Sequence, residues 1–266
     1  MNHEAVLAAY DEQVRRRPTA DGPDVRVERA DGVVRTVSSG GGWTGVTWSD
    51  LNEVTADTVI AAQVDRFTHL MRSWEWKHYS YDLPPDLPQR LRAAGLTPEP
   101  VEALLVAEIA DLALDVQVPA GVRLLPVVDA QGVSDLVRVH EEVFGGDHDP
   151  TGTALAAQLA EQPEAVAAVV AVVGRTPVAA GRVELPSGSE FAGLWGGGTL
   201  PAWRGRGVFR CLVAYRAALA AAAGFRYLQV DASADSQPIL RRLGFVELAT
   251  TTPFAHPGRA SRRPGR

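Results

Sequence analysis

The sequence predicts an α/β (α+β) protein built of strands and flanking helices, and three observations support this prediction. Residues 191–200 form an apolar run interrupted by glycines, which is typical of a buried strand. An apolar stripe over residues 208–222 recurs at steps of three and four, which indicates a helix packed on one face. Alternating runs on both sides of Asp31-Gly32 predict a β-hairpin.

Periodicity and turn residues predict a series of elements in the N-terminal half. In chain order these are a helix (4–17), two hairpin strands (25–29 and 33–37), a strand (43–48), a helix ending near 71, a strand (75–81), a short helix (87–94) and a strand (103–109). Pro18 ends the first helix and Gly95 ends the short one, because neither residue continues a helix well.

The C-terminal half repeats this order after two opening helices. A linker over 116–120 precedes a strand (122–126), two helices (133–144 and 153–161), three strands (167–173, 178–185 and 191–200), a helix (208–222), a strand (227–231) and a helix (236–243). The segment from residue 256 onward is basic, apolar-poor and rich in Pro, Gly and Arg, which predicts disorder. We therefore divide the chain into residues 1–118, residues 119–255 and a tail of residues 256–266.

Composition excludes several classes of protein. The 266 residues suffice for one large or two small cores, and a formal charge of −6 argues against a nucleic-acid partner. The acidic balance suits a small cationic partner better. The single cysteine, Cys211, excludes an internal disulfide and falls on an apolar helix stripe. No signal pattern or bilayer-length apolar run is present, so we expect a cytoplasmic protein with no membrane partner.

The stretch from Thr199 to Arg210 has the pattern of a phosphate cradle. A strand that turns through Arg-Gly-Arg-Gly into a helix leaves several backbone N–H groups unpaired and aimed at one point. The helix dipole and two arginines add positive potential, so an anion should bind there. The alternative is a plain strand-to-helix turn, in which glycine serves geometry alone. No Gly-Lys-Ser/Thr and no Gly-x-Gly-x-x-Gly followed by a ribose-binding acid is present, which excludes two common nucleotide loops.

Residues 204–209, Arg-Gly-Arg-Gly-Val-Phe, resemble the Arg/Gln-x-x-Gly-x-Gly/Ala pyrophosphate loop of the GCN5-related N-acetyltransferases, the GNAT superfamily. Downstream, residues 227–231 stand where that family has its fifth strand, and the helix that closes on Gly244-Phe245 resembles the family's following signature. The resemblance covers about half of the chain, roughly residues 122–251. It implies a GNAT-like mixed sheet for that half.

The order of elements further suggests that residues 20–115 are a second, incomplete GNAT-like unit. In this unit Trp48-Ser49-Asp50-Leu51 replaces the glycine- and arginine-rich cradle, so it has no cofactor loop. Its expected role is structural, beside the C-terminal unit and walling the acceptor pocket. The alternative is an unrelated α+β extension.

The resemblance implies an acyl-CoA-dependent N-acyltransferase that moves an acetyl or short acyl group from coenzyme A to a small-molecule amine by direct transfer. Acetyl-CoA or another acyl-CoA would be the co-substrate, with no metal. The alternative is a catalytically weak GNAT-like protein that binds acyl-CoA as a sensor or scaffold. The residues that the resemblance assigns to the coenzyme are Thr199 and Leu200 for the pantetheine arm, and Arg204, Gly205, Arg206, Gly207, Val208 and Phe209 for the pyrophosphate. Phe209 departs from the family pattern, where Gly or Ala is usual.

The family's catalytic positions are altered in this chain. The family commonly has a glutamate near the start of the strand before the cradle, and the matching position here is Gly193. The nearest carboxylates, Glu190 and Glu184, are therefore the candidate general bases. The family's usual tyrosine acid is replaced by Leu240, which favours the sensor alternative. Ser236 is a nearby hydroxyl that we also place at the coenzyme, although a helix N-cap is its favoured role.

Two further features leave alternatives open. His140, Glu141, Glu142, Asp147, His148 and Asp149 cluster in sequence, but their spacing matches no standard zinc pattern, so we expect no metal and instead a loop that attracts a cationic amine. The three glycines at 196–198 weaken a strand, which indicates either close approach of a ligand or a bulge that splays the strands.

Overall fold

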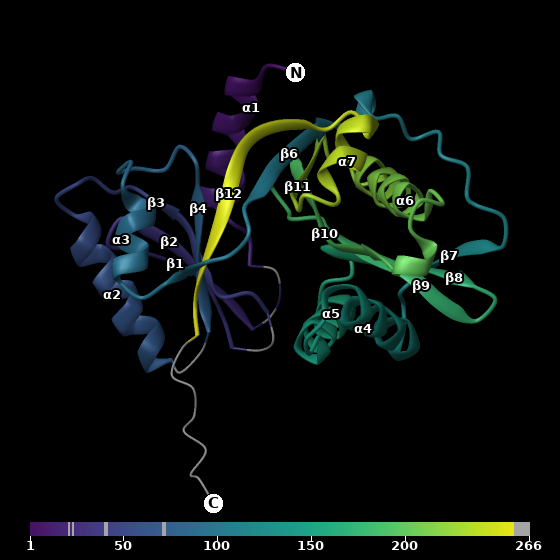
Figure 1. Ribbon diagram of the computed structural model, residues 1–266, viewed down its shortest axis with the longest axis horizontal. Coiled ribbons are helices and arrows are strands. Elements are labelled where there is room, and N and C mark those ends of the chain that lie inside the picture. The colour runs from purple at the N-terminus through teal and green to yellow at the C-terminus, as the bar shows by residue number, and fades with distance from the viewer. Residues whose placement is uncertain (21, 23, 40–41, 71–72, 258–266) are drawn as a thin grey trace, which may run out of the picture.

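The computed structural model describes residues 1–20, 22, 24–39, 42–70 and 73–257 (Figure 1). Residues 258–266 of the predicted tail lie outside the described residues. The start of that prediction is wrong, because His256 is the last residue of a strand. No helix in the described ranges combines the length and the apolar character needed to cross a bilayer.

The described residues form one mixed sheet of 12 strands. The strands are β1 (Val25–Ala30), β2 (Val33–Ser38), β3 (Gly45–Ser49), β4 (Trp74–Tyr79), β5 (Thr97–Pro98), β6 (Glu102–Glu108), β7 (Val122–Pro126), β8 (Val166–Val173), β9 (Thr176–Glu184), β10 (Phe191–Thr199), β11 (Tyr227–Ala232) and β12 (Val246–His256). The mixed α/β class predicted from the sequence is confirmed.

Helices cover both faces of this sheet. They are α1 (His3–Tyr10), α2 (Ala56–His69), α3 (Leu87–Ala93), α4 (Ala130–Phe144), α5 (Asp149–Glu161), α6 (Val208–Ala222) and α7 (Gln237–Leu243), with short helical turns η1 (Asp11–Arg16), η2 (Ile109–Asp111) and η3 (Pro201–Trp203). Helices α6 and α7 lie on one face of the C-terminal part, and α4 and α5 lie on the other (Figure 1). Helices α2 and α3 cover the outer face of the N-terminal part.

The predicted N-terminal hairpin is present. Strands β1 and β2 pair up to Ala30 and Val33, and the two turn residues Asp31 and Gly32 have φ values of 56° and 75°. A two-residue turn with positive φ at both positions matches the twist of the strands that it joins. Asp-Gly therefore specifies the register of this hairpin locally.

The centre of the sheet is built by an exchange of strands. The strand order is β1-β2-β3-β4-β12-β6-β11-β10-β9-β8-β7, and the short β5 pairs with β12 outside this order. The last strand, β12, thus lies between two strands from the first half of the chain, and β6 lies between two strands from the second half. The first part of β12 pairs with β6 and its second part pairs with β4, changing partners at Thr251 (Figure 1). The division proposed at residue 118 separates the chain, but it does not separate the sheet.

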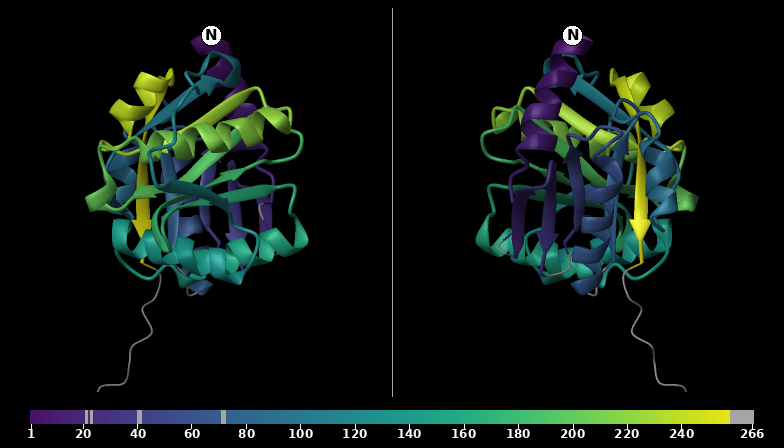
Figure 2. Two further views of the ribbon diagram at one scale, coloured as in Figure 1. Left: turned by 90° about the vertical axis from the view of Figure 1, so that its right-hand side faces the viewer. Right: turned by 90° about the vertical axis from the view of Figure 1, so that its left-hand side faces the viewer.

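Helix α1 packs where the two halves meet. Val6 and Tyr10 of α1 join an apolar cluster with Tyr79 of β4, Leu104 of β6 and Phe191 of β10. The Tyr10 and Tyr79 hydroxyls are 2.9 Å apart. In both side views α1 stands at one end of the molecule, next to the strands of the sheet centre (Figure 2). Residues from both halves therefore share one core.

Cutting the chain between residues 116 and 117 tests this exchange. Fragment 1–116 lacks β12, which leaves β4 and β6 as unpaired edges, so neither fragment should fold alone. The two fragments produced together should associate and recover the circular dichroism and cooperative melting of the intact chain. A cooperative unfolding transition of isolated fragment 1–116 would contradict the prediction.

Candidate functional site

The cradle is an open helix N-terminus. Helix α6 begins at Val208 after Gly207, whose φ is 84°, and Gly205 has a φ of 74°. Within the described chain, no acceptor takes the backbone N–H groups of residues 205–210. A Cβ at either glycine would meet nothing within 4 Å, so the loop faces open space. This geometry suits an anion held by several amides.

The charged side chains of the loop are arranged around this opening. Arg204 and Arg206 are both exposed. The Arg204 Nε donates to the carbonyl of Thr199 over 3.2 Å, and the Arg206 guanidinium lies 4.6 Å from the centre of the Trp203 ring. Neither arginine forms an ion pair with a carboxylate in the described part of the chain. Both guanidinium groups are therefore available to pair with an anionic ligand.

The apolar side chains among the residues that the sequence analysis assigns to the coenzyme face the core. Leu200 and Val208 are buried, and Phe209 packs against the cluster beneath α6. The Phe209 side chain thus points away from the cradle, while its N–H stays at the loop. The departure of Phe209 from the family pattern leaves the cradle open. Thr199 is buried, and its Oγ1 has no hydrogen-bond partner.

Strand β10 diverges from its parallel neighbour just before the cradle. It pairs with β11 only over residues 191–193, opposite 227–229. On its other side, the register with β9 shifts between Trp195 and Gly198, where β10 holds one extra residue. This is a β-bulge, and Gly196 within it has a φ of 58°. Beyond Gly193 the two parallel strands therefore separate toward the cradle.

The three glycines of the bulge allow helices to approach from both faces. A Cβ on Gly196 would lie 2.6 Å from the His140 ring of α4, and a Cβ on Gly198 would lie 2.9 Å from Val143 of the same helix. On the opposite face, a Cβ on Gly197 would lie 3.2 Å from Arg216 of α6. Of the two explanations left open by the sequence, the packing supports the bulge.

Arg216 secures the bulge from the α6 side. Its side chain is only 1% exposed, and its Nη1 donates to the carbonyls of Arg182 and Trp195 over 3.1 and 3.4 Å. Burial, with the nearby charge of Arg182, lowers the pKa of Arg216 to about 9. No carboxylate in the described chain pairs with it. Sequence reasoning missed this residue, although an arginine next to the apolar stripe of α6 was the available signal.

His140 secures the bulge from the α4 side. Its Nε2 lies 2.8 Å from the carbonyl oxygen of Gly196. Burial is the main cause that lowers the pKa of His140 to about 4, and the charges of Arg182, His148 and Arg216 act in the same direction. The ring is therefore neutral at pH 7, and Nε2–H donates to the carbonyl.

The residues considered for a metal separate into two groups. The carboxylates of Glu141, Asp147 and Asp149 lie within 4.8 Å of one another and are exposed. His140 is turned inward to Gly196, and the His148 Nε2 lies 2.9 Å from the carbonyl oxygen of Gly145. The exposed carboxylates form a negative patch where the end of α4, the connecting loop and the start of α5 meet.

The candidate bases from the sequence lie in different settings. Glu190 precedes β10, at the end of the strand away from the cradle, and its carboxylate accepts from Gln13 over 2.9 Å. Glu184 ends β9, pairs in register with Gly193 and lies 3.3 Å from the Nε of Arg182. Glu184 is therefore nearer to the diverging segment than Glu190.

Ser236 stands at the N-cap position of α7 but makes no capping hydrogen bond. Its hydroxyl instead donates to the carbonyl of Ser233 over 3.2 Å. The favoured capping role was wrong, because the turn formed with Ser233 takes the hydroxyl first.

A buried polar cluster joins the two halves on the face that carries α4. The ammonium group of Lys77, from β4, contacts the carboxylate of Asp231, from β11, and lies 5.6 Å from the centre of the Trp195 ring. Burial alone would lower the pKa of Lys77, but Asp231 and Glu75 outweigh it and raise that pKa. Glu102, at the start of β6, is half-buried in the same cluster.

Several buried polar atoms around this cluster have no partner. They are Trp195 Nε1, Gln229 Oε1, Asp231 Oδ1 and Thr251 Oγ1. Buried polar groups are normally hydrogen-bonded, so unpartnered ones that share a face mark a place for a polar ligand or water. Sequence reasoning did not bring these residues together, because they come from five strands that are distant in the chain.

The N-terminal half has a similar strand divergence, but the chain itself fills it. Strands β3 and β4 pair in parallel only at Gly45–Val46 opposite Glu75–Trp76. Beyond that point Arg15 enters, with its Nε donating to the carbonyl of Thr47 and its Nη2 to Asp82. Its guanidinium lies 3.8 Å from the centre of the Tyr79 ring. This slot is closed.

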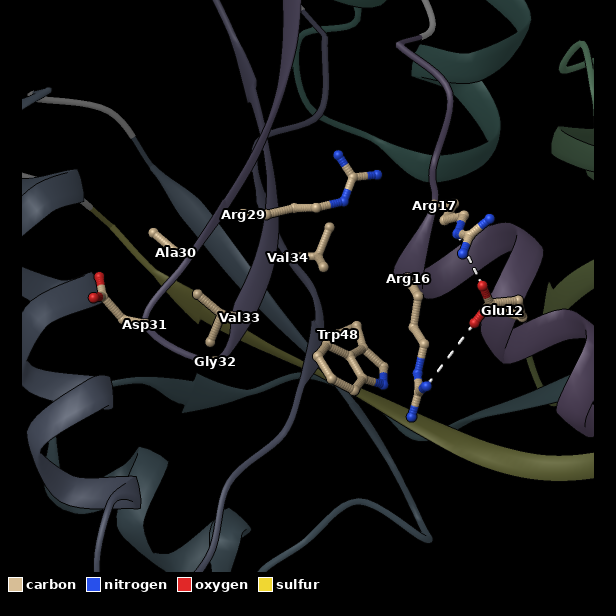
Figure 3. A pocket seen from close by; sticks show the side chains of 10 residues that line it. All are labelled: Glu12, Arg16, Arg17, Arg29, Ala30, Asp31, Gly32, Val33, Val34 and Trp48. Carbon is tan, nitrogen blue, oxygen red and sulfur yellow. Dashed lines mark ion pairs between the residues drawn. The ribbon is translucent and has the colours of Figure 1, made fainter.

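Next to Arg15, the N-terminal half has an open hollow of about 510 Å³ (Figure 3). Arg16, Arg17, Arg29 and Trp48 line it, and the Glu12 carboxylate pairs with Arg17 at 2.8 Å and more loosely with Arg16 at 3.9 Å. No open helix N-terminus lies among the residues that line the hollow, and all of them belong to the N-terminal half, whereas the cradle belongs to the C-terminal half. We assign no ligand to it.

No protein-family model matches the sequence, and no curated protein matches it. Solved structures match it over nearly the whole chain. A GCN5-related N-acetyltransferase from Kribbella flavida shares 20% identity over 97% of this chain and 96% of that one, with a TM-score of 0.69. A GCN5-related N-acetyltransferase from Sphaerobacter thermophilus shares 12% identity over 97% and 87%, with a TM-score of 0.59.

The chain therefore has the GNAT fold. A tandem GNAT protein from the clavulanic acid biosynthesis pathway also matches, with 14% identity over 97% of this chain and 95% of that one and a TM-score of 0.61. This match along both halves fits the interpretation of two GNAT-like units.

Gly196→Ala tests the close packing at the bulge. The new Cβ would overlap the His140 ring in addition to the strain of a positive φ, so the variant should be less stable than its control by about 1–3 kcal/mol. The control is Gly188→Ala, at a φ of 76° with nothing within 4 Å of the new Cβ. Urea unfolding measures both, and equal destabilisation would contradict the prediction.

His140 should make stability fall in acid. Its pKa is about 4 in the folded protein and about 6.5 when unfolded, so the unfolded chain binds more protons between these values. Stability should therefore fall as pH decreases from 6.5 to 4. His140→Gln keeps an N–H donor without this titration and should reduce that loss by up to about 3 kcal/mol. Urea unfolding between pH 4 and 8 measures this loss, and an equally steep loss in His140→Gln would contradict the prediction.

Proposed function

We propose that this protein is an N-acyltransferase that transfers an acetyl or another short acyl group from acyl-coenzyme A to a small-molecule amine. The observation that carries this proposal is the open N-terminus of α6, directly after a bulged strand that separates from its parallel neighbour. The GNAT fold of the whole chain supports it.

The cradle residues suit the pyrophosphate of the coenzyme. Unpaired amides from Gly205 to Arg210 point out of the helix start, where the dipole favours negative charge. Arg204 and Arg206 add two exposed cations that can pair with phosphate oxygens. We assign Gly205, Arg206, Gly207, Val208 and Phe209 to this role through their backbones.

The diverging strands suit the pantetheine arm. Past Gly193, strand β10 no longer pairs with β11, so the backbone groups of this edge that make no other hydrogen bond are available to the amides of the arm. Thr199 and Leu200 end this open edge next to the loop. Acyl-coenzyme A supplies the thioester, and these residues hold it between the cradle and the polar cluster.

A second function, binding acyl-coenzyme A without efficient transfer, is favoured by one observation. The position of the family's usual tyrosine acid is Leu240, which is buried in the core beneath α7. No hydroxyl can reach a departing thiolate from that position. Amine-dependent release of free thiol separates the two functions.

Gly207→Asp tests the coenzyme site. A carboxylate placed among the cradle amides should repel the pyrophosphate and weaken binding at least tenfold in acetyl-CoA titration calorimetry. Gly174→Asp is the matched control, because Gly174 also has a positive φ of 60° with nothing within 4 Å but lies in the β8–β9 turn. Equal affinity of the two variants would overturn the coenzyme site.

A further inference from the structure

We infer that Glu102 is the general base of the transfer reaction, and that the acceptor amine binds against it in the polar cluster shared by the two halves. This inference rests on the proposed function. It places the catalytic carboxylate on β6, a strand encoded in the first half of the chain, and not on the strand before the cradle.

The position of Glu102 follows from the strand exchange. It begins β6, next to β11 on one side, and its register partner on β12 is Thr251. Asp231 and Gln229 of β11 and Trp195 of β10 have side chains on the same face. Glu102 therefore faces the side from which the separated strands β10 and β11 are approached.

The Glu102 carboxylate makes no contact in the described structure that would explain a structural role. In the part of the chain that the structure describes, it forms no hydrogen bond and no ion pair, although it is half-buried. Burial raises the pKa of Glu102 to about 7, the attraction of Lys77 opposes this, and Asp231, Glu75 and Glu99 add to the rise. A base with a pKa near the working pH is deprotonated often enough to accept a proton and basic enough to hold it.

The surrounding groups favour a cationic acceptor. Lys77 and Asp231 neutralise each other, and Glu75 is half-buried beside them and accepts from the indole of Trp43. Strand β12 contributes the uncharged Thr251. An ionised Glu102 thus gives the cluster a net negative charge. The unpartnered Asp231 Oδ1 and Thr251 Oγ1 are acceptors suited to the N–H groups of a primary ammonium.

The chemical step balances with these groups. The acceptor ammonium releases one proton to the Glu102 carboxylate, and its nitrogen attacks the thioester carbonyl carbon. The C–N bond forms, the C–S bond breaks, and the nitrogen loses its second proton to solvent while the coenzyme A thiolate takes one from solvent. Glu102 then returns its proton to solvent.

Glu190 and Glu184, the candidate bases from the sequence, lie in settings that differ from that of Glu102. Glu190 accepts from Gln13 at the far end of β10, about 30 Å of extended strand from Thr199. Glu184 lies beside the Arg182 guanidinium. Glu102 differs from both, because its carboxylate is half-buried and unpaired beside the unpartnered polar atoms.

The test is amine-dependent thiol release from acetyl-CoA by the full chain between pH 5.5 and 9, with spermidine, cadaverine, glycinamide and tyramine as probes. For the wild type, kcat/KM should fall as pH decreases below about 7. Glu102→Gln should lower kcat about 100-fold or more, remove that acid limb and leave acetyl-CoA affinity unchanged. Glu99→Gln removes the same charge from an exposed position nearby and should keep wild-type kcat.

The outcomes are distinct. Retained kcat and pH profile in Glu102→Gln would overturn the assignment of Glu102, as would loss of turnover in Glu184→Gln or Glu190→Gln alone. Acetyl-CoA binding by the wild type without transfer to any probe would also overturn it, while coenzyme binding would stand. Absence of acetyl-CoA binding by the wild type would overturn the proposed function itself. Melting of Glu102→Gln at or above the wild-type temperature at pH 8 would show that the variant is folded.

Discussion

The bulge in β10 is the constraint on which the candidate site depends. An extra residue in this strand frees backbone carbonyls from the ladder with β9, and buried carbonyls need donors. Arg216 from α6 and His140 from α4 supply them, one from each face. Because α6 also begins at the cradle, the same contacts set where the open helix N-terminus stands relative to the separating strands.

Two parallel strands diverge in each half of the chain, but only the divergence in the C-terminal half leads to an open site. In the C-terminal half the gap between β10 and β11 leads to an open loop with free amides. In the N-terminal half the gap between β3 and β4 is filled by Arg15, whose guanidinium bonds to Thr47 and Asp82. A buried cation with such partners is costly to dislodge. The divergence of β3 and β4 is thus closed, and the N-terminal half contributes Lys77 and Glu102 to the shared cluster.

Local sequence signals predicted the elements well. Asp31-Gly32 specified a hairpin through its positive φ values, and the apolar stripe of residues 208–222 predicted α6 with its bounds. The cradle was readable because glycine and arginine at a strand-to-helix turn have a direct physical meaning. These features depend on residues close together in the chain.

The rest of the site was beyond sequence reasoning because it depends on distant strands. Lys77 and Glu102 have no local pattern that marks them, and only the pairing of β12 between β4 and β6 brings them next to Asp231. Arg216 was overlooked because a charged residue beside an apolar stripe usually reaches solvent. Ser236 was assigned a cap from its position alone, whereas its hydroxyl bonds to Ser233.

The placement of β12 also has a consequence for how the protein is made. A ribosome releases the N-terminal half first, yet the strand that completes the centre of the sheet comes from residues 246–256, which are made after every other strand of the sheet. Until then β4 and β6 have exposed backbone edges, which attract other nascent chains. Assembly of the sheet centre must therefore wait until residues 246–256 have been synthesised, and a nascent chain without them cannot form the shared polar cluster.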